Sequence, residues 1–169
     1  MIFLISCIMS KTDLSVQRDG AGKYAGEIRQ HALLIETFGP SATLAVAPEG
    51  VRFAVGGDLA FGALWESMCG GDSWCDWLAP SLRYSILGLQ LLEYQHERGS
   101  NYVGLASPYA QLHIPFGCEP FNNTRSEKNR DPEPCLSLFG SVEYQNRLQA
   151  SNQVFWGVGL SYAFLIYPR

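Results

Sequence analysis

Long apolar runs are missing from this chain of 169 residues. A transmembrane helix needs about 20 consecutive and mostly apolar residues, and no uncharged apolar run in the sequence approaches that length. We therefore exclude a helical membrane protein. Charged residues are also scarce, at 17% against 47% hydrophobic residues. Because the apolar residues alternate with other residues instead of forming blocks, the sequence favours β-strands.

Clusters of basic residues are missing as well. The chain has 12 Lys and Arg residues against 16 Asp and Glu residues, which gives a net charge of −4. A protein that binds nucleic acid neutralises phosphates with clustered Lys and Arg side chains. We therefore expect no nucleic-acid partner.

Catalytic and metal-binding motifs are also missing from the sequence. The sequence contains no G-x-S-x-G, no H-E-x-x-H and no Gly-rich phosphate loop. Structural zinc sites use closely spaced Cys pairs or nearby His residues, whereas Cys69 and Cys75 lie six positions apart and His96 and His113 are isolated. We therefore predict no catalytic residue, no metal and no cofactor. We expect the isolated His31 and His113 to be packed or hydrogen-bonded.

Residues 153–167 alternate between two kinds of side chain, and this period of two predicts a β-strand. One face carries large apolar residues, which include Val154, Trp156, Val158 and Leu160, and the other face carries mostly small ones. In a membrane barrel, the large face meets lipid and the small face lines a crowded interior. A fully buried strand of a soluble sandwich would also lack charges, so this strand alone leaves both folds open.

Residues 51–65 repeat this alternation, and their small face also carries Arg52 and Asp58. Gly and Ala weaken a strand whose polar face meets water. The interior of a small membrane barrel is polar, and opposite charges can pair there away from lipid. The pattern therefore favours a membrane barrel over an edge strand with surface charges. The large residues of this strand are Phe53, Val55, Leu59 and Phe61.

The remaining strands are less regular. In the strand predicted at residues 135–149 we expect Leu136 and Leu138 to face outward and Glu143 to face inward. In the strand predicted at residues 81–97 we expect Arg83 to face inward. Breaks in the alternation near Gly88 and at 107–108 predict β-bulges. Whether residues 24–47 form one bent strand or two short ones stays open. We place these strands at residues 24–38, 43–47, 81–97, 102–116 and 135–149.

The N-terminal residues 1–23 are expected to form a leader or a flexible segment. Residues 1–10 are apolar but lack the positive start and the length of a complete secretory signal. The segment 4–7 is similar to the end of a bacterial lipoprotein signal, which ends on a cysteine such as Cys7. Residues 11–23 are polar and contain Gly, which is typical of a flexible segment.

The strands and their aromatic ends resemble the outer-membrane β-barrel superfamily of Gram-negative bacteria, over most of residues 24–167. The resemblance implies an all-β fold, an antiparallel up-and-down (meander) β-barrel of about six to eight strands that spans the membrane, with residues 24–169 as one domain. The chain departs from the family because Pro168 and Arg169 follow its last aromatic residue. The aromatic ends are Trp65, Tyr84, Trp156, Tyr162 and the segment 164–167.

The order of the connections is a second departure. From residue 51 onward they run long, short, long and short. If the C-terminus is periplasmic, as in that family, the short hairpins face the outside and the long connections face the periplasm. This order is the reverse of the usual arrangement.

We expect a non-enzymatic structural or surface protein, of adhesion type, in the bacterial outer membrane. Its partners are expected to be outer-membrane lipid and an unidentified surface or envelope protein. Ion pairs among Arg52, Asp58, Arg83 and Glu143 would plug the lumen. The residues expected to face lipid are Phe53, Val55, Leu59, Phe61, Leu136, Leu138, Val154, Trp156, Val158 and Leu160.

Two alternatives stay open. A soluble lipocalin-like barrel, periplasmic or secreted, would turn the same large apolar faces inward around a small hydrophobic ligand. A barrel enzyme acting on lipid A is the second, because residues 93–101 resemble the histidine and serine region of outer-membrane lipid A deacylases. In this chain Ser100 follows His96 by four positions rather than by two.

We predict disulfides between Cys69 and Cys75 and between Cys118 and Cys135, because each pair lies at or beside one long connection. Four cysteines allow three pairings, and an exported protein meets an oxidising compartment. Each bridge would contribute about 2–4 kcal/mol. Peptide mapping without reduction should recover both linked pairs. Four free thiols in protein from its native host would contradict both the pairing and export.

Overall fold

A computed structural model of the chain describes residues 8–34, 37–61, 84–116, 135–148 and 150–166. Each strand pairs antiparallel with the next, and β8 pairs with β1 to close a barrel, so the predicted up-and-down barrel is confirmed. No helix long enough and apolar enough to cross a membrane occurs in the described ranges. The strands are β1 (Ile8–Asp19), β2 (Tyr24–Leu34), β3 (Phe38–Ala47), β4 (Gly50–Ala60), β5 (Ile86–Glu97), β6 (Ser100–Phe116), β7 (Cys135–Gln145) and β8 (Gln153–Ile166).

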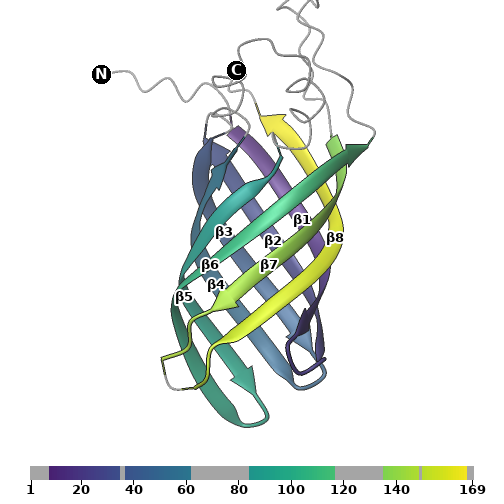
Figure 1. Cartoon of the computed structure of the whole chain (residues 1–169). Helices are drawn as coiled ribbons and strands as arrows, with labels where there is room; N and C mark the ends of the chain where they lie inside the picture. The colour runs from purple at the N-terminus through teal and green to yellow at the C-terminus, as the bar shows by residue number, and fades with distance from the viewer. Residues whose placement is uncertain (1–7, 35–36, 62–83, 117–134, 149, 167–169) are drawn as a thin grey trace, which may run out of the picture.

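The two ends of the barrel differ in their connections (Figure 1). At one end, which we call the short-turn end, the chain passes from β1 to β2, from β3 to β4, from β5 to β6 and from β7 to β8. At the other end, which we call the terminal end, β1 begins and β8 finishes. β4 and β6 also end there, and β5 and β7 begin there; the intervening segments 62–83 and 117–134 lie outside the described residues.

The N-terminal strand β1 corrects the prediction that residues 1–23 form a leader or flexible segment. Residues 8–19 form a full strand that pairs with both β2 and β8, so the barrel cannot close without it. Its inward face is polar, but its outward face carries Ser10, Thr12 and Arg18 beside only Leu14 and Val16 as exposed large apolar residues. Because this outward face mixes polar and apolar residues, the alternation that marks a strand is weak in the sequence of β1.

The region 24–47 forms two strands rather than one bent strand. β2 ends at Leu34, and a hydrogen bond from the Thr37 amide to the Leu34 carbonyl at 3.0 Å closes the turn before β3. The predicted strand 24–38 therefore extends too far, and the predicted piece 43–47 is the second half of β3. In the same way, the strand predicted at 81–97 begins at Ile86.

A bulge in β5 explains the break in its alternation. Val55 pairs with Leu92 and Gly56 pairs with Gln90, which leaves Leu91 without a counterpart on β4. The bulge therefore lies at Leu91 rather than near Gly88. Gly56 is required at this point because an added Cβ would lie 2.2 Å from the Leu89 carbonyl oxygen.

The neighbouring strand β6 has its own irregularity beside this bulge. Ala106 adopts a positive φ of 53° directly before Ser107, where the sequence predicts a break. Ser107 pairs with Gln90, and Leu105 pairs with Leu92. The two irregularities therefore lie side by side, and large apolar residues face outward on both sides of the break, such as Leu89 and Leu92 on β5 and Leu105 and Leu112 on β6.

Candidate functional site

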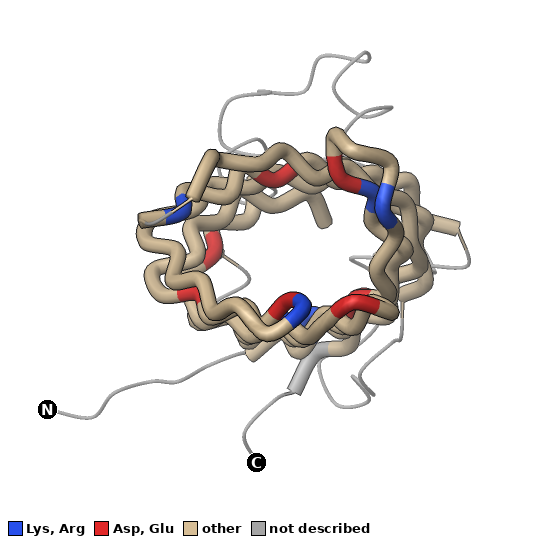
Figure 2. Tube along the Cα trace, turned by 90° about the horizontal axis from the view of Figure 1, so that it is seen from below, with Lys and Arg blue, Asp and Glu red and all other residues tan. Residues whose placement is uncertain are grey.

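The lumen contains the buried charges of the described strands. Six carboxylates and four cations are buried there, together with His31 and His113. Because the opposite charges are nearly balanced, they can neutralise one another without bulk water. Figure 2 shows charged residues distributed around the closed ring of strands. The ten charged residues are Lys11, Asp13, Asp19, Glu27, Arg29, Arg52, Asp58, Glu93, Glu143 and Arg147.

Arg52 on β4 is the centre of the larger group of charges. Its guanidinium donates to Glu27 at 2.6 Å and to Glu93 at 3.2 Å, and it also pairs with Glu143. Gln17 accepts a further hydrogen bond from Arg52 at 3.0 Å. These four partners belong to β1, β2, β5 and β7. Arg52 therefore connects five strands across the lumen.

Arg29 on β2 shares two of these carboxylates. It lies 2.7 Å from Glu143 and 3.1 Å from Glu27. Its guanidinium also stacks over the Tyr109 ring, 3.8 Å from the ring centroid. We call Arg29, Arg52 and their carboxylates Glu27, Glu93 and Glu143 the arginine cluster. Each carboxylate in it faces at least one guanidinium, so no charge is left unpaired in the low-dielectric interior.

His31 on β2 is the centre of a second group. Its Nε2 lies 2.8 Å from Asp13 and its Nδ1 lies 2.5 Å from Asp58. Asp58 also accepts hydrogen bonds from Ser41 at 2.9 Å and from the Tyr109 hydroxyl. Because the Tyr109 ring contacts Arg29 while its hydroxyl contacts Asp58, this tyrosine joins the two groups.

Lys11 on β1 extends the second group and is 0% exposed. Its ammonium lies 3.1 Å from Asp13, 3.1 Å from Gln111 and 2.9 Å from the Nε2 of His113. Because an ammonium only donates, Nε2 accepts and Nδ1 donates to the Ser137 hydroxyl 2.9 Å away. We call Lys11, Asp13, His31, Asp58 and His113 the histidine cluster.

An apolar layer lies toward the terminal end of the lumen. Its members are almost completely buried, and Tyr84 packs against them. Tyr109 joins this layer to the histidine cluster, because its hydroxyl donates to Asp58. The residues are Met9, Leu33, Ala60, Ile86, Tyr109 and Ala163.

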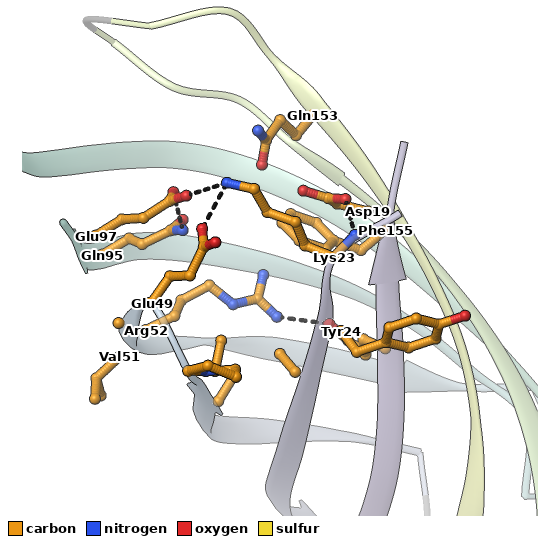
Figure 3. Close-up of a pocket in the computed structure, with 16 residues that line it drawn as sticks. Asp19, Lys23, Tyr24, Glu49, Val51, Arg52, Gln95, Glu97, Gln153 and Phe155 are labelled. Atoms are coloured by element: carbon orange, nitrogen blue, oxygen red, sulfur yellow. Dashed lines mark hydrogen bonds and ion pairs between the residues drawn. The ribbon is translucent and has the colours of Figure 1, made fainter. Parts of the chain in front are cut away.

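The short-turn end instead has a cavity of about 280 Å³. Lys23, in the turn between β1 and β2, lies 2.7 Å from Glu49 and 2.6 Å from Glu97 (Figure 3). The backbone amide of Lys23 donates to Asp19 at 2.8 Å. Lys23 therefore connects three separate hairpins over the mouth of the lumen, while Arg52 contributes to the cavity wall below.

These mouth contacts shift the pKa values of two groups in the turns. Hydrogen bonding to Glu49, and then to Glu97, raises the pKa of Lys23 above its ordinary value of 10.5. The hydrogen bond from Lys23 lowers the pKa of Glu49 below its ordinary value of 4.5. Both shifts favour the charged forms, so the ammonium and the carboxylate hold each other ionised across the neutral range.

The structure separates the residues for which we predicted lumen ion pairs. Arg52 and Glu143 meet in the arginine cluster. Asp58 is also buried in the lumen, but it contacts His31 in the histidine cluster rather than Arg52. Arg83 lies outside the described residues.

Nine of the ten residues that we expected to face lipid lie on the outer wall. Their exposed fractions run from 38% at Val55 to 67% at Val158. Phe61 follows the last residue of β4 and is half-buried, so its contact with lipid stays a prediction. The nine are Phe53, Val55, Leu59, Leu136, Leu138, Val154, Trp156, Val158 and Leu160.

Several lumen residues were not identified from the sequence. Lys11 and Asp13 lie in the segment that we interpreted as a leader. Glu27, Arg29 and His31 alternate along one face of β2, and this alternation of ionisable residues was the available signal for an inward face. Nothing local indicated that the Glu93 of β5 meets them, because the contact depends on closure of the barrel.

The cysteine and metal predictions can be followed only in part. Cys135 begins β7 and is buried, whereas Cys69, Cys75 and Cys118 lie outside the described residues. The two disulfides therefore stay predictions. Among the described residues, no group of three or more His, Cys, Asp or Glu is arranged to hold a metal ion.

Comparison with known proteins identifies a similar fold and no family. No known family and no curated protein matches the chain. The solution NMR structure of the de novo designed protein TMB2.3 matches it with a TM-score of 0.53 and 13% sequence identity. The match covers 93% of this chain and 94% of the designed one.

Replacing Glu143 by Leu should strongly destabilise the barrel, because it leaves Arg29 and Arg52 facing only Glu27 and Glu93. The expected loss is about 3–5 kcal/mol in the free energy of unfolding. The double variant Arg29→Met/Glu143→Leu should lose less than the sum of the two single variants, because one charge of each sign is removed. Urea unfolding in detergent micelles measures all three.

Glu49→Gln is the matched control, since it removes a carboxylate from an exposed ion pair at the mouth. Its loss should be much smaller than that of Glu143→Leu, because solvent-exposed ion pairs contribute little to stability. Equal losses for Glu143→Leu and Glu49→Gln would contradict a role for buried pairing in stability.

The Lys23 contacts predict a defined pH dependence at the mouth. The contribution of Lys23 is complete below its ordinary pKa of 10.5 and disappears as the pH rises through its higher folded-state pKa. The contribution of Glu49 is present above its ordinary pKa of 4.5 and disappears as the pH falls through its lower folded-state pKa. In Lys23→Met, the carboxylate titration of Glu49, followed by NMR, should move to higher pH. An unchanged midpoint would show that Lys23 does not hold this carboxylate.

Proposed function

We propose that the protein is a transmembrane β-barrel of the outer-membrane type, with a structural or surface role and a lumen plugged by its own side chains. One observation carries this proposal. The described strands place large apolar side chains on the outer wall and ionised side chains in the lumen, which is the reverse of a soluble barrel. A solution NMR structure of a designed transmembrane barrel with the same fold supports it.

The outer wall has the layered composition that a bilayer requires. Leu and Val dominate its middle, and aromatic residues lie toward both ends. Tyr and Trp are favoured where the acyl chains meet the headgroups. At the short-turn end the exposed aromatic residues are Tyr24, Phe53, Tyr94, Tyr144 and Trp156, and toward the terminal end they are Phe38, Phe116 and Tyr162.

The filled lumen favours a structural role over transport. The arginine cluster crosses the interior through Arg52, and the histidine cluster continues the network toward the apolar layer. A pore needs a continuous path of water, whereas eight-stranded barrels are narrow enough for side chains to fill. We therefore infer a plugged barrel that acts through its surfaces.

The lipocalin-like alternative has less support. A carrier of hydrophobic ligands needs an apolar interior, but here Lys11, Arg29 and Glu143 are among the most deeply buried side chains. Its apolar residues would also have to meet water over most of the outer wall. Such a large exposed apolar surface is typical of contact with a membrane.

The lipid A enzyme alternative finds no support in the predicted His–Ser pair. The Nδ1 of His96 lies 2.8 Å from the side-chain oxygen of Asn101 rather than bonding to Ser100. Ser100 itself is exposed at the start of β6. We therefore propose a non-enzymatic protein of the bacterial outer membrane, with membrane lipid as its partner.

Nitroxide labels on the outer wall test the proposal. In a cysteine-free background reconstituted in vesicles, labels at Leu138→Cys and Val158→Cys should be reached by oxygen, which dissolves in lipid, and shielded from a water-soluble nickel complex. A label at Arg98→Cys in the β5–β6 turn is the water-exposed control. If the nickel complex reaches positions 138 and 158 as well as it reaches position 98, the transmembrane placement is contradicted and the soluble barrel is favoured.

A further inference from the structure

Arg18 is an exception on the outer wall. Among the outward-facing residues of the eight described strands, it is the one Arg, Lys, Asp or Glu. A charge on a lipid-facing surface is unfavourable at the centre of the bilayer and favourable only near the headgroups. Arg18 lies one residue before the end of β1, at the short-turn end. Its position therefore matches the headgroup layer rather than the acyl chains.

Two aromatic rings hold the Arg18 side chain. The register pairs Arg18 with Tyr24 on β2 and with Trp156 on β8, so all three lie on the same outer face. The guanidinium carbon lies 5.5 Å from the ring centroid of each aromatic residue. Cation–π contacts of this kind orient a guanidinium without using its N–H donors. The guanidinium also lies beside the β1–β2 turn, since an added Cβ at Gly22 would lie 3.2 Å from the Arg18 Nη2.

The Arg18 guanidinium keeps its donors available. Within the described part of the chain it makes no ion pair and no side-chain hydrogen bond, in contrast to Arg29, Arg52 and Arg98, which all pair with carboxylates. A planar guanidinium presents paired N–H donors that match the oxygens of a phosphate. Arg18 is therefore oriented by its neighbours and still able to bind an anion.

We propose that Arg18, Tyr24 and Trp156 form a binding site for the phosphate group of an anionic membrane lipid. The aromatic rings pack beside the upper acyl chain and glycerol region, and the guanidinium donates to the phosphate oxygens. This inference rests on the proposed transmembrane placement, because only that placement brings lipid to the outer wall. It goes beyond that placement by assigning a headgroup preference to one face, formed by β8, β1 and β2, at the short-turn end.

Fluorescence of Trp156 provides the test. The three other tryptophans, Trp65, Trp74 and Trp77, are replaced by Phe, and the barrel is reconstituted in mixtures of phosphatidylcholine and phosphatidylglycerol. One lipid at a time carries bromine on its acyl chains, which quenches a tryptophan in contact with it. Comparing the two series gives the relative association of anionic and zwitterionic lipid beside Trp156. We expect a preference for phosphatidylglycerol of roughly five-fold, from the attraction of one interfacial cation.

Variants of Arg18 identify the group responsible. Arg18→Gln should abolish the preference, and Arg18→Lys should retain part of it, because it keeps the charge and loses the planar donor pair. Arg98→Gln is the matched control, because Arg98 is a cation at the same end whose side chain is 70% exposed and paired with Glu49. This control should leave the preference unchanged.

Each result has a distinct meaning. If brominated lipids of both kinds fail to quench Trp156, the transmembrane placement is wrong. If both quench equally, and Arg18→Gln changes nothing, the transmembrane placement stands and the headgroup site is refuted. Loss of the preference on adding millimolar inorganic phosphate, at constant ionic strength, would overturn the lipid assignment in favour of a site for free phosphate.

Discussion

Closure of eight strands into one narrow ring is the constraint on which the rest of this structure depends. Every strand side chain must point either into the lumen or onto the outer wall, because successive residues alternate between the two faces. The lumen then excludes bulk water, and any ion placed there needs a partner. The contacts of Arg52 with Glu27, Glu93 and Glu143 are a direct consequence, since they join strands that only closure brings together.

The same constraint explains how the interior charges are arranged. Arg29 and Arg52 share Glu143, and His31 lies between Asp13 and Asp58, so most charges have more than one partner. Such networks are sensitive to the loss of one member, because the remaining charge stays buried. They also specify a single packing of the strands, since a shift in register by one residue would move the charges to the outer wall.

The two ends of the barrel are chemically different. The terminal end of the lumen is lined by an apolar layer that includes Met9, Leu33 and Ile86, whereas the short-turn end has a cavity crossed by Lys23. On the outside, Arg18 and its aromatic neighbours lie at the short-turn end. Under the proposed transmembrane placement, these two chemically different ends would meet the two leaflets of the membrane differently.

The sequence by itself determined the faces of the strands with clear alternation. In β4, β7 and β8 the period of two is a local property, so Phe53, Leu138 and Val158 could be assigned to the outer wall before the barrel was known. The strand β1 could not, because Ser10, Thr12 and Arg18 make its outward face polar and hide the alternation. The ion pairs were also inaccessible to local reasoning. Whether Asp58 meets Arg52 or His31 depends on register and strand tilt around the closed ring, and only the tertiary structure fixes these.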